Sequence, residues 1–335
     1  MNALGLDHPV VLAPMAGGPS TPSLAAAVSE AGALGLLASG YLGADELARQ
    51  MADTRSRTTR PFGVNLFVPG GAPPDPAALA AYVERLGGES RRAGVALGAP
   101  RSDDDGWEAK LALLAEDPPA VVSFTFGCPE PAVLAAMRER GSSVWVTITS
   151  TDEARQAAAA GADALVVQGA EAGGHRATFV DSNDAPVIGL LALLQSVRRA
   201  VDLPLVATGG IATSGAVAAV LCAGAGAAQV GTAFMRCPEA GTWEEHRRAL
   251  ATSTPTALTR AFTGRLARGL RNRFIDAHGP SAPIAYPQVH HLTSPLRKAG
   301  RAAGDPEVVN LWAGQAHALA EELPAGEVVA KLTPA

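Results

Sequence analysis

Residues 164–176 read ALVVQGAEAGGHR, a short apolar run followed by a glycine-rich turn that ends in a histidine and an arginine. The run 164–167 is an apolar, β-branched segment typical of a strand inside a parallel sheet. Glycines directly beyond such a strand let the backbone approach a ligand closely. Histidine is the side chain that most readily exchanges a proton near neutral pH. The stretch therefore predicts a proton-transfer group at the carboxyl end of a core strand, where α/β proteins hold their chemistry.

The same strand pattern recurs along the chain. Seven further short apolar runs read as buried strands, at residues 10–13, 34–38, 62–66, 121–124, 144–148, 205–207 and 228–230. Alanine-rich helical segments lie between them, at residues 23–30, 45–51, 133–139, 152–160, 190–200 and 214–221. Parallel strands require crossovers of this kind. The alternation predicts an α/β fold, a TIM (β/α)8 barrel with an added, mainly helical subdomain.

Three segments do not follow the alternation. The long interval 69–118 contains a predicted helix at 76–92 and a strand-like run at 95–97, which we interpret as an excursion outside the barrel. After the eighth strand, residues 237–278 are predicted to be helical. Residues 306–323 are predicted to form a helix, because their apolar residues fall on one stripe.

These patterns divide the chain into three parts. We expect a cofactor-binding barrel over 1–236, a helical subdomain over 237–300 and a C-terminal helix that packs back on the barrel within 301–335.

Composition narrows the classes of partner. The chain has 335 residues, 47% of them hydrophobic and 4% aromatic, and a net charge of −5 without a basic stripe, so we expect small molecules and no nucleic acid. Apolar runs are too short to predict a membrane span. Without a signal-peptide pattern, and with only Cys128, Cys222 and Cys237, the sequence predicts a reducing, cytoplasmic setting.

Two glycine-rich turns indicate a phosphate site. Residues 208–214, TGGIATS, follow the seventh predicted strand, and residues 229–234, QVGTAF, span the end of the eighth. Barrels often bind phosphate with these two loops and a helix N-terminus. One GG alone is an ordinary tight turn, whereas both together favour phosphate. Because neither a Rossmann fingerprint nor a Walker A loop is present, FMN, with its single phosphate, is a compatible cofactor.

Residues at other strand ends are suited to contact a flat ring system. Asn65 and Gln168 are placed to hydrogen-bond the polar edge of a flavin ring, and Met15 is placed to lie against its face. Taken singly, Met15 reads as ordinary core and Asn65 as a turn residue. Only the combination favours a flavin.

Six motifs, in order along nearly the whole chain, resemble those of the nitronate monooxygenases. They are PMAG at 14–17, VNLF at 64–67, SFTFG at 123–127, EAGGHR at 171–176, GGIA at 209–212 and GRLARG at 264–269. The resemblance implies an FMN-dependent barrel with a helical subdomain, which oxidises alkyl nitronates with O₂ to carbonyl compounds and nitrite.

The resemblance also assigns residues. It implies that His175 handles the proton and that Tyr286 lines the substrate pocket. Together, the resemblance and the strand-end loops predict the flavin contacts Met15, Ala16, Asn65, Gln168, Gly173, Gly174, Gly209, Gly210, Gln229, Val230, Gly231 and Thr232. The chain departs from the family pattern at Ala177, where glycine is frequent, and at His290 and Ser294, where tyrosines are expected.

The implied chemistry suits a histidine. A nitroalkane has an acidic C–H beside its nitro group, so a neutral imidazole, with a reference pKa of about 6.5, can remove that proton or orient the resulting anion. Arg176 would keep the local field positive. The electron transfer to O₂ belongs to the flavin.

Other functions and roles fit parts of the pattern. An FMN-dependent NAD(P)H reductase is the closest alternative, either an enoyl-acyl-carrier-protein reductase, which has a similar Glu-Ala-Gly-Gly-His stretch, or an NADH:quinone reductase. Arg176 and residues 264–269 favour the monooxygenase. A third possibility is a flavin-binding or phosphate-binding barrel that has lost catalysis and serves as a sensor or as a partner in an assembly. No histidine spacing predicts a metal site. The basic cluster Arg265, Arg268, Arg271 and Arg273 is interpreted as structural ion pairing.

Overall fold

A computed structural model describes residues 4–71 and 73–334 and contains a ring of eight parallel strands. Around the ring these are β1 (Val10–Leu12), β9 (Ala227–Val230), β8 (Leu205–Thr208), β6 (Ala164–Gln168), β5 (Ser143–Ile148), β4 (Val121–Thr125), β3 (Phe62–Phe67) and β2 (Gly35–Ala38). The ring closes between β1 and β2, where the Leu12 amide donates to the Leu34 carbonyl at 2.8 Å. The predicted α/β barrel is confirmed.

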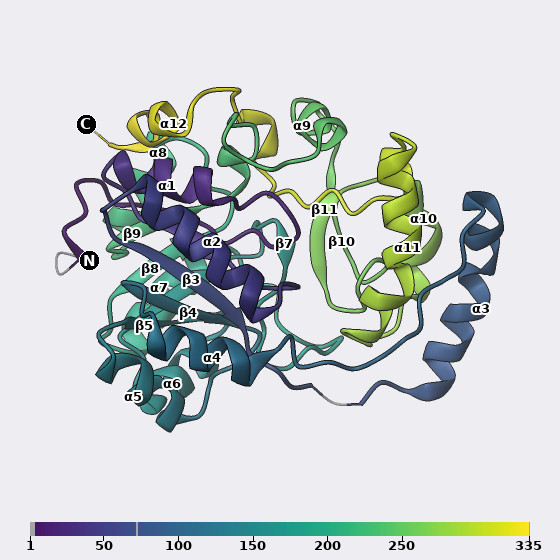
Figure 1. Ribbon diagram of the computed structural model, residues 1–335, viewed down its shortest axis with the longest axis horizontal. Coiled ribbons are helices and arrows are strands. Elements are labelled where there is room, and N and C mark those ends of the chain that lie inside the picture. The colour runs from purple at the N-terminus through teal and green to yellow at the C-terminus, as the bar shows by residue number, and fades with distance from the viewer. Residues whose placement is uncertain (1–3, 72, 335) are drawn as a thin grey trace.

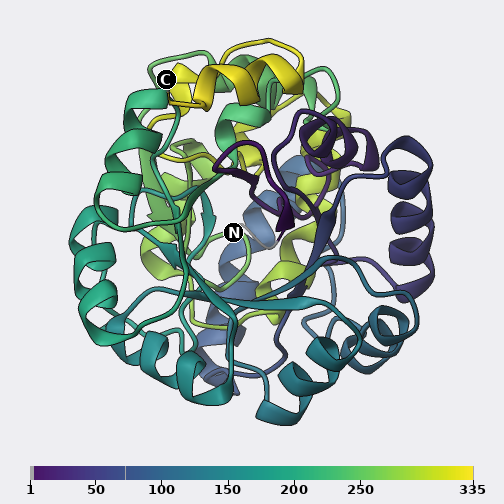
Figure 2. The same cartoon turned by 90° about the vertical axis from the view of Figure 1, so that its left-hand side faces the viewer.

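Helices surround the strands, as the view in Figure 2 shows. They are α1 (Pro22–Glu30), α2 (Ala44–Arg57), α4 (Trp107–Glu116), α5 (Pro131–Glu139), α6 (Thr151–Ala160), α7 (Leu190–Ala200), α8 (Ser214–Cys222) and α12 (Ala325–Leu332). Several begin at a side-chain cap: the Thr21 hydroxyl accepts the Leu24 amide, and Thr213 accepts the Ala216 amide. Gly35 lets α1 approach β2, because a Cβ there would lie 2.0 Å from the Ala25 carbonyl oxygen.

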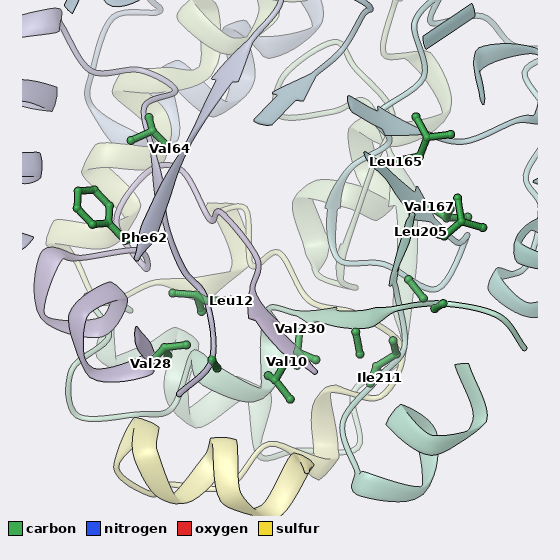
Figure 3. Close-up of a cluster of buried hydrophobic side chains, with 14 of the residues drawn as sticks. Val10, Leu12, Val28, Phe62, Val64, Leu165, Val167, Leu205, Ile211 and Val230 are labelled. Atoms are coloured by element: carbon green, nitrogen blue, oxygen red, sulfur yellow. The ribbon is translucent and has the colours of Figure 1, made fainter. Parts of the chain in front are cut away.

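Alternate strand residues separate into two cores. Val10 and Leu12 point outward and pack, with helix residues such as Val28, in the larger core that Figure 3 shows. Val11 and Trp145 point inward and belong to a smaller cluster inside the barrel. This two-residue period fixes which side chains reach the interior at the carboxyl ends of the strands.

A second unit lies beside the barrel, on the right of Figure 1. It contains α3 (Pro76–Ala93), α9 (Glu244–Leu250), α10 (Arg273–His278), α11 (Gln288–Ala302) and an antiparallel sheet of β10 (Thr256–Thr259), β11 (Ala267–Leu270) and β7 (Gly174–His175). Its core joins α3 to α10 and α11 through side chains that include Tyr82, Phe274 and Leu292. The excursion between β3 and β4 therefore supplies a helix to this second unit. Because β7 pairs with β11, the turn that carries His175 is also attached to the second unit.

Two predicted helices are wrong. Residues 237–278 form α9 and α10 with two strands between them, because the pairing of β10, β11 and β7 joins segments far apart in sequence. Residues 306–323 contain only the 3₁₀ turns Pro306–Val308 and His317–Leu319. Part of that segment runs beside β11, where the Leu270 amide donates to the Leu311 carbonyl at 2.8 Å. The helix that packs back on the barrel is α12, which lies against α1 and α8.

The strand-like run 95–97 is irregular and lies outside the barrel, as expected, whereas α4 was not predicted. Within the described residues, no helix is long and apolar enough to cross a membrane.

Candidate active site

The inward-facing residues change from apolar to polar along the barrel axis. Val166 is followed on the same face by Gln168, and Ala227 by Gln229. These polar ends line a cavity of about 420 Å³ at the carboxyl ends of the strands. All twelve residues predicted to contact a flavin line this cavity, together with His175. The fold thus gathers strand ends from the whole ring into one site.

His175 lies in β7 with its ring among aromatic side chains. Its Nε2 is 2.9 Å from the Thr263 hydroxyl, and its ring centroid lies 5.5 Å from that of Trp312 and 5.7 Å from that of Tyr286. Burial, together with the smaller effects of the Arg265 and Arg297 charges, lowers the pKa of His175 to about 3. The imidazole is therefore neutral at physiological pH, although part of its surface faces the cavity.

Gln168 fastens the histidine turn to the end of β6. Its Nε2 donates to the His175 carbonyl at 3.0 Å, and its Oε1 accepts the Ala177 amide at 2.9 Å. The second Nε2 hydrogen is the only donor that these two contacts leave for a ligand. Ala177, one of the departures from the family pattern, is fully buried behind β7 and does not line the cavity.

Asn65 is held by the neighbouring strand. Its Nδ2 donates to the Ser123 hydroxyl at 2.9 Å and to the Thr125 hydroxyl at 3.0 Å. Its Oδ1 accepts no hydrogen bond from the described residues. Because Asn65 lines the cavity, this oxygen is an acceptor for a ligand donor.

The loops after β8 and β9 offer backbone donors. In the described part of the chain, the amides of Gly209, Gly210, Gly231 and Thr232 donate to no protein acceptor. The N-terminus of α8 follows the first loop, which adds a positive dipole end. Gly210 has φ +69°, and a Cβ on it would lie 2.9 Å from the Glu171 Cβ. Free amides, a helix N-terminus and a glycine that admits no side chain fit a bound phosphate.

One turn of α11 brings positive charge to the same cavity. Arg297, Lys298 and Arg301 line it, and none of them forms a salt bridge with a described carboxylate. Arg297 donates to the His290 carbonyl at 2.8 Å and to the Asn310 Oδ1 at 3.3 Å. Burial lowers its pKa to about 10, so it stays charged at neutral pH. The cavity is therefore suited to anions.

An aromatic wall was not predicted from the sequence. Phe126, in the loop after β4, adopts φ +78° and lies edge-on to His175, with ring centroids 5.6 Å apart. The Arg265 guanidinium lies 4.1 Å from the Phe126 ring centroid, a cation–π contact. A non-glycine residue in the left-handed region is strained, and such residues cluster at functional sites.

Three residues that the family resemblance singled out near the substrate pocket lie around this wall. Tyr286 does not itself line the cavity, although its ring also contacts that of Phe126, at 5.6 Å. His290 stacks on Tyr41 at 4.2 Å, and Ser294 lines the cavity beside it. The two remaining departures from the family pattern therefore lie at the site.

The basic cluster divides into two kinds of contact. Arg271 pairs with Asp276 and Arg273 with Glu89, each at 2.7 Å, as predicted. Arg265 and Arg268 form no such pair with a described carboxylate: Arg265 donates to the Arg176 carbonyl at 3.2 Å, and Arg268 to the Ala170 carbonyl at 2.9 Å. Ion pairing was the wrong interpretation for these two, because the backbone around β7 supplies their acceptors.

A closed barrel with free backbone amides in the loops after its last two strands, beside a neutral histidine, is typical of TIM-barrel enzymes that bind a phosphate-bearing ligand. A protein-family model described as "Nitronate monooxygenase" matches residues 1–335. The chain belongs to the nitronate monooxygenase family, whose members are flavin-dependent oxidoreductases.

Individual relatives agree with this assignment. The chain is 40% identical to a nitronate monooxygenase of Paraburkholderia phytofirmans, over 98% of this chain and 92% of that protein. It is 53% identical to a solved nitroalkane oxidase from Streptomyces ansochromogenes, with a TM-score of 0.95 over 98% of this chain and 95% of the other. FabK from Thermotoga maritima is more distant, at 27% identity and a TM-score of 0.75 over 99% of this chain and 93% of that one.

Proposed function

We propose that the protein oxidises alkyl nitronates, and nitroalkanes, with O₂ to carbonyl compounds and nitrite, using FMN and His175. The observation that carries this proposal is a histidine kept neutral by burial, in a cavity whose cations have no carboxylate partners among the described residues. A neutral imidazole accepts a proton, and the positive field stabilises the anion that remains. The names of the two relatives at 40% and 53% identity support the same substrate class.

The cavity residues fit FMN in two groups. Gly209, Gly210, Gly231 and Thr232 would hold the phosphate with their backbone amides. Met15, Asn65 and Gln168 would contact the ring system, together with the remaining cavity residues Ala16, Gly173, Gly174, Gln229 and Val230. When bound, the flavin supplies the electron transfer between the organic substrate and O₂.

The protein's own part is to bind and orient the substrate and to move a proton. His175 is either the base that removes the α-proton of a nitroalkane or the group that orients a nitronate. Phe126, whose ring contacts that of Tyr286, would form an apolar boundary on one side of the substrate, and Arg297 would provide a fixed charge for the nitro oxygens.

We expect Arg297→Met to raise KM for ethylnitronate about tenfold and KM for neutral nitroethane by a smaller factor. The substitution keeps a long side chain but removes the charge, and a charge-assisted hydrogen bond contributes about 1.5–3 kcal/mol. Steady-state O₂ uptake with each substrate measures both constants. Arg271→Met is the matched control, because its exposed charge pairs with Asp276 in the second unit and does not line the cavity. Equal changes in KM for the charged and neutral substrates would contradict this role.

The decisive experiment is O₂ uptake by the purified flavoprotein with a panel of alkyl nitronates that includes propionate-3-nitronate. Nitrite release with the panel supports the proposal. Anaerobic mixing with NADH or NADPH is the second arm, in which rapid bleaching of the flavin would favour the reductase alternative. No turnover in either arm would favour a flavin-binding barrel without catalysis and would overturn the proposal.

We also propose a reducing, cytoplasmic setting. Cys128, Cys222 and Cys237 are unpaired in the described structure, which supports it.

A further inference from the structure

We propose that Thr263 fixes His175 as the Nε2–H tautomer, so that Nδ1 is the atom that takes the substrate's proton. This inference rests on the proposed function, because it assigns an atom to the base. Thr263 is a positioning residue here, since it acts through His175. Thr263 was not predicted as a site residue, because 88 residues separate it from the histidine in the sequence.

The hydrogen bonds around the Thr263 hydroxyl decide the tautomer. The hydroxyl lies 2.9 Å from the His175 Nε2 and is placed to donate to the Arg265 carbonyl at 3.2 Å. It has one hydrogen to donate. If that hydrogen goes to the Arg265 carbonyl, the hydroxyl accepts from Nε2–H and both bonds form. If it goes to an unprotonated Nε2, the Arg265 carbonyl receives no hydrogen bond from any described group. The Nε2–H tautomer therefore satisfies one more polar group.

The other ring nitrogen faces the ligand. His175 Nδ1 has no hydrogen-bond partner in the described structure, and it is not among the sealed, unpaired polar atoms. Because His175 lines the cavity, Nδ1 is accessible from it. The histidine is thus anchored by one nitrogen and presents the lone pair of the other.

Thr263 sits in a rigid turn. It is 1% exposed, and the Gly264 amide donates to the Arg260 carbonyl at 2.8 Å. Arg260 is itself paired with Asp181 at 2.7 Å. Gly264 has φ +79°, and a Cβ there would lie 2.4 Å from the Ala285 carbonyl oxygen. The hydroxyl therefore occupies a fixed position before substrate arrives, as preorganised catalysis requires.

In this step a proton moves from the substrate carbon to His175. The α C–H bond of the nitroalkane breaks and an N–H bond forms at Nδ1. The electron pair stays with the substrate, which becomes the nitronate anion. His175 becomes an imidazolium whose Nε2–H remains bonded to Thr263. A substrate that enters as nitronate needs no such step.

The test compares Thr263→Val, which keeps the shape and removes the hydroxyl, with Thr263→Ser, which restores it. The holoenzyme is labelled with ¹⁵N-histidine, and the His175 signals are identified by their loss in His175→Asn. We expect a pyrrole-type Nε2 and a pyridine-type Nδ1 in the wild type and in Thr263→Ser, and a mixture in Thr263→Val. We also expect Thr263→Val to lower kcat/KM for nitroethane about tenfold, because a buried donor loses its acceptor. Turnover of ethylnitronate should fall by a smaller factor.

Two results would overturn the inference. One is a pyridine-type Nε2 in the wild type. The other is an equal loss of turnover with nitroethane and with ethylnitronate in Thr263→Val, which would show that Thr263 has only a structural role. If the wild type oxidised no nitronate at all, the proposed function would fail, while the ¹⁵N spectrum would still decide the tautomer.

Discussion

Replacing His175 by asparagine is expected to lower kcat/KM for neutral nitroethane by about 10²- to 10⁴-fold, the range that general acid–base catalysis usually contributes. Asparagine has a similar size and keeps a polar group near Thr263, but it cannot accept the α-proton. Ethylnitronate, which has already lost that proton, should retain a larger share of its turnover. Initial rates of O₂ uptake with the two substrates measure the difference.

The pH profile adds a second test of the same residue. The active base is the neutral imidazole. A lower pKa keeps this imidazole neutral, and the enzyme active, at more acidic pH. With a pKa of about 3, His175 stays active as a base from pH 5 to 8, whereas an ordinary histidine would become protonated below about 6.5. We therefore expect kcat/KM for neutral nitroethane to be flat over the acid part of that range.

A matched histidine separates this role from general loss of packing. His278 is also buried and also has a lowered pKa, but it bonds Glu89 in the second unit and does not line the cavity. His278→Gln should leave kcat/KM for nitroethane within a few-fold of the wild type. Full turnover of both substrates by His175→Asn would show that His175 is neither the base nor the orienting group.

Local sequence patterns were sufficient to predict the strands of the barrel but not the structure of the second unit. Each barrel strand is a short, buried apolar run, so its own residues are sufficient to predict a strand. The strand at Gly174–His175 has two residues and exists because β11 pairs with it, 92 positions from His175 to Ala267. Residues 237–278 were wrongly predicted to be helical for the same reason, because no local sequence pattern indicates that a segment pairs with a strand elsewhere in the chain.

The residues of the candidate site likewise divide into those that the sequence could predict and those that it could not. Gly209, Gly210 and Gln168 directly follow or end core strands, and parallel topology brings all strand ends to one edge, so these residues were predictable. Thr263 and Arg297 come from the second unit, and their positions depend on how that unit packs over the barrel mouth. Arg265 belonged to a recognised basic cluster, but its place over Phe126 follows from tertiary structure alone.

Gly210→Val is expected to raise the Kd for FMN at least about 100-fold and to yield a nearly colourless protein. A side chain at φ +69° costs about 1–2 kcal/mol, and the new Cβ would meet the Glu171 Cβ at 2.9 Å. Glu171 cannot move away freely, because its carboxylate accepts the Leu190 amide at the start of α7. The loop must therefore shift, and losing two charge-assisted hydrogen bonds to phosphate, each contributing about 1.5–3 kcal/mol, raises Kd by that factor. Quenching of flavin fluorescence on titration into apoprotein measures Kd.

Gly215→Ala is the control on the same segment. It lies one residue inside α8, its φ is ordinary, and the nearest atom to a new Cβ is the Thr213 hydroxyl at 3.9 Å. Alanine also favours the helix, so FMN affinity should be unchanged. Circular dichroism of both variants checks that the barrel is retained. If a folded Gly210→Val protein bound FMN as tightly as the wild type, the loop after β8 would not be the phosphate site, and the proposed placement of FMN beside His175 would fail.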